Sequence, residues 1–238
     1  VLAWLTWISS AEAEPELRWL WGTQVLAKEV PEAAELNQQI SAYLLNLSLH
    51  EPPEIRSNRN GAWQSRNKKF LDFKAHPKSS GIRKQVKRLR EAVDSALKEY
   101  LGAESEAHAV QIEASWANVN PACGLNGPHV HPFAALSGAY YVNCGNNATS
   151  RLPCAINLMD PRPSAPMAAL PAEVRDALDF GIDWTLSLWP GTVLIFPSWL
   201  SHWVPPNSAP RQRMTISFNA GLALCETSLL GCWHEGPK

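Results

Sequence analysis

The sequence predicts a mainly β domain with flanking helices, in which an N-terminal helical layer packs on a C-terminal β-sandwich or barrel. Before about residue 107, apolar residues recur at helical spacing. Beyond it, short apolar or alternating runs are separated by Gly, Pro and Asn turns, as in all-β domains. The chain of 238 residues is taken as one domain, with an N-terminal strand and helical layer over 1–108, a β core over 109–225 and a C-terminal tail over 226–238.

The N-terminal layer is expected to hold one strand and two helices. Residues 17–30 have the pattern of a strand that enters the domain. A helix is expected from Pro31 to about Leu49, and a second from Ser80 to Leu101, with Gly102 as its cap. Each has one apolar stripe: Leu36, Ile40, Tyr43, Leu44 and Leu47 in the first, and Ile82, Val86, Leu89, Val93, Ala96, Leu97 and Leu101 in the second.

Six strands are expected in the β core. They lie at residues 110–119, 136–142, 154–159, 184–189, 192–196 and 213–220. A Pro-Gly turn at Pro190 and Gly191 starts the fifth. Polar and apolar residues alternate along the last strand, which begins at Arg213, so one of its faces is polar.

Composition excludes several classes of partner. The net charge of -1 and the pI near 6.7 provide no field for nucleic acid or an anionic membrane surface. No run approaches the roughly 20 apolar residues of a membrane span. A small-molecule or peptide substrate is therefore expected. The chain begins at Val1 rather than Met, so we expect that a natural N-terminus is missing and predict neither compartment nor oligomeric state.

The five cysteines include no Cys-x-x-Cys pair, which argues against a zinc ribbon. Cys144 and Cys154 flank a polar loop and could form a disulfide in an oxidising compartment. Free thiols in a reducing compartment are the alternative.

Two histidines, His129 and His131, stand one residue apart before an apolar run. On an extended strand, side chains at i and i+2 leave the same face, so both imidazoles can point at one centre. His202, at the end of the apolar strand that starts after the Pro-Gly turn, is the expected third ligand, and imidazole suits iron, zinc, copper or nickel. Two alternatives stay open: Asp160 supplies a carboxylate ligand, or His131 only orients His129 or a bound water.

Five motifs follow one another along the chain: Trp116-Ala-Asn118, His129-Val-His131-Pro, Ser137-Gly-Ala-Tyr140-Tyr141, Phe196-Pro-Ser-Trp-Leu-Ser-His202 and Arg213-Met-Thr-Ile-Ser-Phe-Asn219. In this order they resemble a branch of the 2-oxoglutarate and Fe(II)-dependent oxygenases that carries a His-x-His-Pro motif. The segment from Ser57 to Ser65 is also similar. The likeness covers most of the chain from residue 57 onward.

The resemblance implies a double-stranded β-helix, or jelly-roll, of cupin-like type. It also implies Fe(II), 2-oxoglutarate as co-substrate and O2, with hydroxylation of a primary substrate and release of succinate. Arg213 would pair with the 5-carboxylate of 2-oxoglutarate and Thr215 would add a hydroxyl, while Arg211 competes for the role of Arg213. Asn118, Tyr140, Tyr141 and Ser198 are expected either to line the pocket or to pack within buried strands, and both alternatives stay open.

One departure from the superfamily concerns charge, because His131 stands where a carboxylate ligand is usual. Two rival functions are therefore kept: a three-histidine cupin-like dioxygenase that does not use 2-oxoglutarate, and a non-catalytic β-sandwich with a structural metal. Trp63, Trp199 and Trp203 are expected near the mouth of the pocket, with a place in the core as the alternative for Trp63. Hydroxylation, desaturation and ring formation all stay open.

Overall fold

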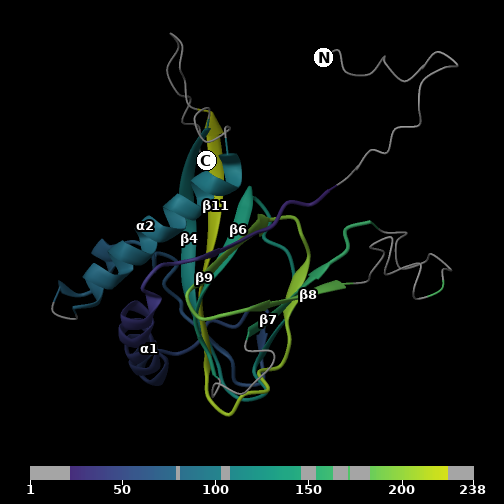
Figure 1. Ribbon diagram of the computed structural model, residues 1–238. Coiled ribbons are helices and arrows are strands. Elements are labelled where there is room, and N and C mark those ends of the chain that lie inside the picture. The colour runs from purple at the N-terminus through teal and green to yellow at the C-terminus, as the bar shows by residue number, and fades with distance from the viewer. Residues whose placement is uncertain are drawn as a thin grey trace, which may run out of the picture.

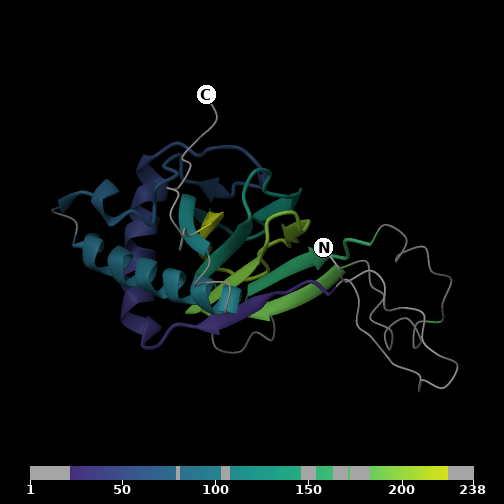
Figure 2. The same ribbon diagram turned by 90° about the horizontal axis from the view of Figure 1, so that it is seen from above.

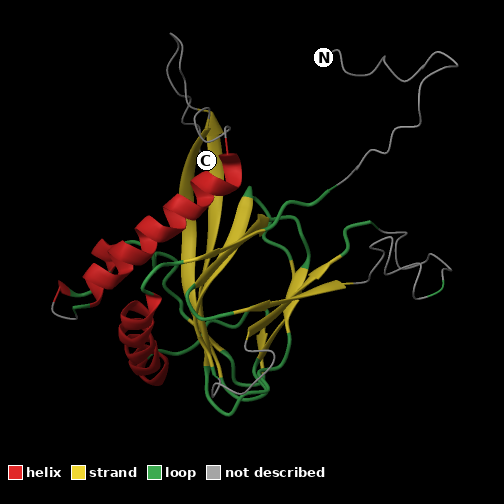
Figure 3. Ribbon diagram, in the orientation of Figure 1, coloured by secondary structure: helices red, strands yellow, loops and turns green. Residues whose placement is uncertain are grey.

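The computed structural model describes residues 22–78, 81–102, 108–145, 154–162, 171 and 183–224. Two β-sheets face each other, and two long helices cover the outer side of the larger sheet (Figure 1, Figure 3). The helical elements are α1 (Ala33–His50), η1 (Phe73–Ala75) and α2 (Ile82–Leu101). The strands are β1 (Leu26–Glu29), β2 (Asn58–Arg59), β3 (Trp63–Gln64), β4 (His108–Asn120), β5 (Leu125–His129), β6 (Leu136–Cys144), β7 (Cys154–Met159), β8 (Asp183–Leu188), β9 (Thr192–Pro197), β10 (His202–Val204) and β11 (Arg213–Leu224).

Strand order defines the two sheets. The six-stranded sheet runs β1-β9-β6-β11-β4-β3 and the five-stranded sheet runs β2-β5-β10-β7-β8. Neighbouring strands in both sheets are antiparallel. Seen from above, the helices lie on one side of this sandwich and the smaller sheet on the other (Figure 2). The predicted fold class, a mainly β domain with a helical layer, is confirmed.

The helical layer is held by apolar packing on the outer face of the six-stranded sheet. The apolar stripes predicted for both helices point to this face, and their central residues are fully buried. Full burial of one such side chain contributes about 2 kcal/mol. The buried set on the helices is Leu36, Ile40, Leu44, Ile82, Val86, Leu89, Val93, Ala96, Leu97 and Tyr100, and it meets Val193, Ile195, Met214, Ile216 and Phe218 of the sheet.

The inner face of the same sheet differs in chemistry. Along β11, Met214, Ile216 and Phe218 belong to the helix-facing core, whereas Arg213, Thr215, Ser217 and Asn219 line a cavity. The alternation predicted for this strand therefore separates a face that packs in the apolar core from a face that lines a polar pocket. A second apolar cluster, with Tyr141, Ile156, Leu188, Leu194, Phe196 and Leu200, fills the rest of the space between the sheets.

Strand and helix ends agree with the local signals. Gly102 has a φ of 55° and its N–H bonds to Glu99 and Lys98 at the end of α2, and Gly191 has a φ of 98° at the turn before β9. The expected first strand is found only over β1, and the part of that prediction up to residue 21 lies outside the described residues, as does the tail over 226–238. The N-terminal segment also contributes β1 and β3 to one sheet and β2 to the other.

A disulfide between Cys144 of β6 and Cys154 of β7 joins the two sheets, with the Cα atoms 5.1 Å apart. This favours the oxidised alternative of the two left open by the sequence, and such bonds are typical of oxidising compartments. Cys144 is the register partner of Arg213, so the crosslink lies beside that residue. Neither of the long helices has an apolar stretch of the length that a membrane span needs.

Candidate metal centre

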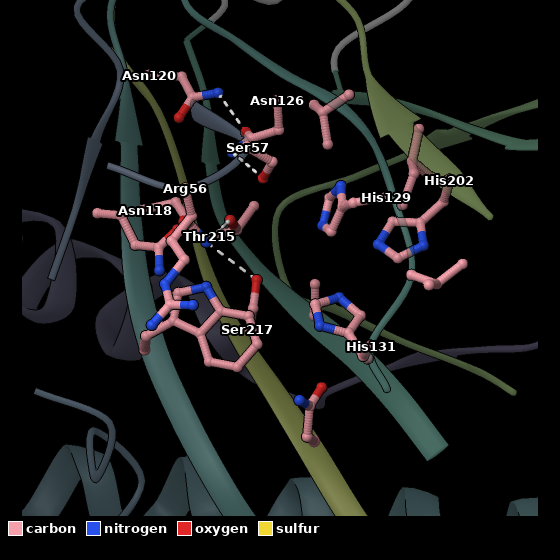
Figure 4. Close-up of a pocket in the computed structure, with 18 of the residues that line it drawn as sticks. Arg56, Ser57, Asn118, Asn120, Asn126, His129, His131, His202, Thr215 and Ser217 are labelled. Atoms are coloured by element: carbon pink, nitrogen blue, oxygen red, sulfur yellow. Dashed lines mark hydrogen bonds between the residues drawn. The ribbon is translucent and has the colours of Figure 1, made fainter. Parts of the chain in front are cut away.

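A cavity of about 600 Å³ lies between the sheets. Its walls come from β4, β6, β9 and β11 of the larger sheet, from β5, β7 and β10 of the smaller one, and from the segment between α1 and η1. Figure 4 shows that the labelled histidines stand on one side of it and Asn118, Thr215 and Ser217 on the other. A volume of this size accommodates a small-molecule ligand.

The three predicted histidines converge in this cavity. Their ligand atoms lie within 4.8 Å of one another, and they form the metal-binding group found among the described residues. The ring centroids are 4.4 Å apart for His129 and His202, 5.0 Å for His129 and His131, and 5.1 Å for His131 and His202. Such a group can hold one divalent transition metal.

Strand pairing sets the positions of these rings. His129 ends β5 and His202 begins β10, and the two are register partners on adjacent antiparallel strands. The sequence placed His202 at the end of the preceding strand, but β9 ends at Pro197 and a turn intervenes. His131 lies two residues beyond β5 instead of on it, and its backbone N–H bonds to the carbonyl of Ser198 at 3.0 Å.

Backbone carbonyls orient two of the three imidazoles. Nδ1 of His129 is 2.7 Å from the carbonyl oxygen of Gly127, and Nδ1 of His202 is 2.9 Å from that of Leu200. An Nδ1–H donor to a carbonyl leaves the Nε2 lone pair free for a metal. The ring of His131 has no hydrogen-bond partner among the described residues and packs beside Trp116, with ring centroids 5.6 Å apart.

Burial keeps all three imidazoles neutral at pH 7. Desolvation, followed by the neighbouring His202 and His129, lowers the pKa of His131 to about 3. Desolvation and His129 lower the pKa of His202 to about 4, and burial also lowers the pKa of His129. A metal binds neutral imidazole, so the donor atoms of this site are in the required form.

Arg213 is a buried cation at another wall of the cavity. It lies on β11, paired in register with Asn120 of β4 and Cys144 of β6, and is only 5 % exposed. Its Nη2 has no hydrogen-bond partner within the described part of the chain. Burial lowers the pKa of Arg213 to about 10, which leaves the guanidinium charged at neutral pH. A buried, charged donor without a partner is costly and suits an anionic ligand.

Asn118 links the hydroxyls next to Arg213. Its Nδ2 donates to Thr215 Oγ1 at 3.2 Å and to Ser217 Oγ at 3.0 Å (Figure 4). Because both hydroxyl oxygens accept from the amide, their O–H groups are directed to other acceptors. Thr215 and Asn118 thus line the cavity as the sequence predicted.

Two predicted pocket residues lie elsewhere. Tyr140 faces the helical layer, where it is fully buried and its hydroxyl donates to Asn37 Oδ1 at 2.6 Å. Its neighbour Tyr141 lines the cavity instead, because successive side chains of a strand leave opposite faces. Ser198 does not line the cavity, and its hydroxyl donates to the carbonyl of Ala134, which fixes the loop after His131.

The expected rim of tryptophans is corrected in the same way. Trp63 is a core residue, 6 % exposed, whose indole donates to the carbonyl of Glu51. Neither Trp199 nor Trp203 lines the cavity, and the Trp203 indole donates to Asp183. The rival ligand Asp160 accepts hydrogen bonds from the Arg162 guanidinium and is not part of the histidine group.

Three basic residues at the cavity were missed by the sequence reasoning. Arg56, Arg59 and Lys68 line it, together with the indole of Trp116. Their sequence signal was the polar, turn-rich stretch that holds Ser57 to Ser65, which had been noted for its likeness to an oxygenase segment. The sequence did not show that β2 pairs with β5 and β3 with β4. These pairings bring Arg56 and Lys68, which flank the stretch, to the cavity.

Comparisons with known proteins agree with this geometry. Residues 114–219 match the family described as "Putative 2OG-Fe(II) oxygenase". Similar solved structures include a prolyl-4-hydroxylase from Pseudomonas putida (TM-score 0.51, 13% identity, covering 84% of this chain and 92% of that one). Another is a prolyl hydroxylase from Trichoplax adhaerens in complex with a peptide fragment of hypoxia inducible factor (0.55, 12%, 83% and 83%).

A third is SnoK, a non-haem alpha ketoglutarate dependent carbocyclase from nogalamycin biosynthesis (0.54, 10%, 85% and 82%). At these identities the likeness establishes the fold, which is the predicted double-stranded β-helix. No functionally curated protein is significantly similar to this chain in sequence.

Proposed function

We propose that the protein is a non-haem dioxygenase that couples oxidative decarboxylation of 2-oxoglutarate to hydroxylation of a second substrate, because residues 114–219 match a 2OG-Fe(II) oxygenase family. The observation that carries the proposal is the unpartnered Nη2 of the buried Arg213 in the cavity that also holds the three histidines. A metal-binding module without a keto acid would have no use for that cation.

The residues present fit the cofactors of this family. His129, His131 and His202 would hold Fe(II), since three neutral imidazole donors suit that ion. Arg213 would pair with the distal carboxylate of 2-oxoglutarate, and the Thr215 hydroxyl, which already accepts from Asn118, would donate to it. When bound, Fe(II), the keto acid and O2 supply the oxidation: one oxygen atom enters succinate, the other enters a substrate C–H bond, and CO2 leaves.

The contribution of this chain is positioning. The carbonyls of Gly127 and Leu200 fix the orientation of two imidazoles before any ligand arrives. Arg213 sets the direction of the keto acid by a planar, two-pronged contact that a lysine ammonium cannot make. Trp116 and Phe196 line the cavity with apolar surface and thereby limit the access of water near the histidines.

A second candidate is a cupin-like dioxygenase that binds its organic substrate to a three-histidine metal without 2-oxoglutarate. The neutral donor set favours it, because no carboxylate ligand accompanies the histidines among the described residues. The two candidates differ in their use of Arg213. Under the second one, Arg213→Ala leaves turnover intact.

Anaerobic titration of the Fe(II)-loaded protein with 2-oxoglutarate tests the proposal. The keto acid is expected to produce a visible metal-to-ligand charge-transfer band in the wild type. The band should disappear in His131→Ala and persist in His50→Ala, a matched change of an exposed histidine on α1. No band in the wild type would refute the proposal, and a band that survives in His131→Ala would reassign His131 to an orienting role.

A further inference from the structure

The charges around the cavity are of one sign. Arg56, Arg59, Lys68 and Arg213 all line it, and no Asp or Glu side chain is among the lining residues that the structure describes. Arg213 is buried, whereas the other three lie on the segment before η1. We call Arg56, Arg59 and Lys68 the basic rim. Figure 4 shows that the Arg56 side chain extends into the cavity on the side of Asn118 and Thr215, opposite the histidines.

The rim cations are only partly neutralised. The carboxylate of Glu54 bonds to both Arg56 Nε at 2.6 Å and Lys68 Nζ at 2.7 Å. Among the described residues Arg59 has no acidic partner, and its Nη1 donates to the backbone carbonyls of Arg56 and Asn58. Three cations against one carboxylate leave two positive charges at the rim. These two charges are exposed to solvent and can bind an anionic ligand.

The metal ligands do not offset this charge. Three neutral imidazoles add no charge to Fe(II), and the two carboxylates of 2-oxoglutarate would balance the charge of the ion. With Arg213 included, the net charge of the set is therefore one positive unit. An oxygenase with a carboxylate ligand would be one unit more negative at its centre. This step rests on the proposed function. It means that the second substrate meets a net positive cavity even after the cofactors are bound.

An aromatic surface connects the rim with the histidines. Lys68 Nζ lies 5.2 Å from the ring centroid of Trp116, and the Trp116 ring lies beside His131. A ligand that packs along this indole would place one end at the rim and the other near the metal ligands. One wall of the cavity therefore offers a cation for a charged group and the Trp116 indole for an apolar group.

We propose that the second substrate is a small organic anion, with a carboxylate or phosphate held by Arg56, Arg59 and Lys68 and an apolar portion lying along Trp116. The rim determines specificity, because an anion is attracted by these cations and a neutral substrate is not. Arginine guanidinium forms two-pronged contacts with either anion, so both sources share one chemistry.

Binding to the Zn(II)-loaded protein, saturated with N-oxalylglycine in place of 2-oxoglutarate, tests this proposal without turnover. The probes are phenylacetate, phenyl phosphate and the neutral phenylacetamide, each titrated by calorimetry. One of the two anions or both should bind, more weakly as salt is added, and phenylacetamide should bind at least tenfold more weakly. The anion that binds more tightly identifies the natural charged group.

Rim variants supply the decisive comparison. Arg59→Gln should weaken anion binding about fivefold and Arg56→Gln combined with Arg59→Gln further, because each partly exposed contact contributes modestly. Lys84→Gln, a matched change on an exposed position of α2, should leave it unchanged. Equal binding of anion and amide, no binding of either anion in the millimolar range, or anion binding that ignores the rim variants would overturn the proposal.

Failure of this inference can be told apart from failure of the proposed function. If the protein does not use 2-oxoglutarate, N-oxalylglycine itself will fail to bind, to the wild type and to Arg213→Lys alike. If only the substrate class is wrong, N-oxalylglycine still binds and the rim variants bind it as the wild type does.

Discussion

The two faces of the six-stranded sheet show how one set of strands serves two purposes. On the outer face, Tyr140 is fully buried against α1 and its hydroxyl bonds to Asn37. On the inner face, the adjacent Tyr141 lines the cavity beside Arg213, whose Nη2 is unpartnered. On the outer face the Tyr140 hydroxyl is paired within the protein, whereas on the inner face Arg213 Nη2 is left unpaired for a ligand. Changes on the two faces should therefore separate stability from binding.

The largest effect is expected from loss of a metal ligand on the cavity side. His202→Ala removes one of three metal donors, so metal affinity should fall by orders of magnitude. The fold should persist, because the lost ring is neutral and lies at the polar cavity and not in the helix-facing core. Equilibrium dialysis with Co(II) and a thermal melt measure the two quantities. A variant that retains wild-type metal affinity would remove His202 from the ligand set.

A core substitution on the outer face should do the reverse. Leu89→Ala, at a fully buried position of α2, is expected to lower the free energy of unfolding by about 3 kcal/mol because it leaves a cavity. The affinity for 2-oxoglutarate should not change. Denaturant unfolding and the charge-transfer titration measure both. The matched change Leu49→Ala, 80% exposed on α1, should cost little.

Arg213→Lys should act on binding alone. The charge is kept, but the planar fork is lost, so the affinity for 2-oxoglutarate should fall about thirtyfold. Arg211→Lys is the matched control, since Arg211 is exposed and the sequence alone had left it as a rival. Equal losses in the two variants would mean that the guanidinium of Arg213 is not the carboxylate anchor.

Tyr140→Phe should have a smaller effect, confined to stability. It leaves Asn37 Oδ1 without its donor, at a cost of about 1.5 kcal/mol. Tyr141→Phe should cost less, because no hydrogen bond of its hydroxyl to the described residues is lost. Paired unfolding curves make the comparison, and a larger loss in Tyr141→Phe would contradict the assignment of the two faces.

The smallest effect concerns pH. Protons compete with a metal for imidazole only as the pH approaches the imidazole pKa. Burial holds the pKa of His131 at about 3 and that of His202 at about 4, and lowers that of His129, so Co(II) affinity should stay nearly flat from about pH 8 to 6. A steep loss of affinity as the pH falls through about 6.5 would show ordinary, solvent-exposed histidines.

His76 shows why a histidine alone is a weak signal. It is 4 % exposed, yet its nitrogens are occupied by the Phe70 carbonyl at 2.6 Å and by the Tyr43 hydroxyl at 3.2 Å. The structure shows a satisfied core residue. What separated His129 and His131 from it was spacing, together with His202 and Arg213 in the order of a known family.

The sequence by itself determined the helices, most of the strands, the identity of the three histidines and the alternation along β11, because these depend on local periodicity and motif order. Only the tertiary structure decided that Tyr141, and not Tyr140, faces the cavity, and that the segment around Arg56 and Lys68 supplies its cations. The physical reason is that a period of two shows which residues share a face, but which face is covered by helices depends on how distant strands pair.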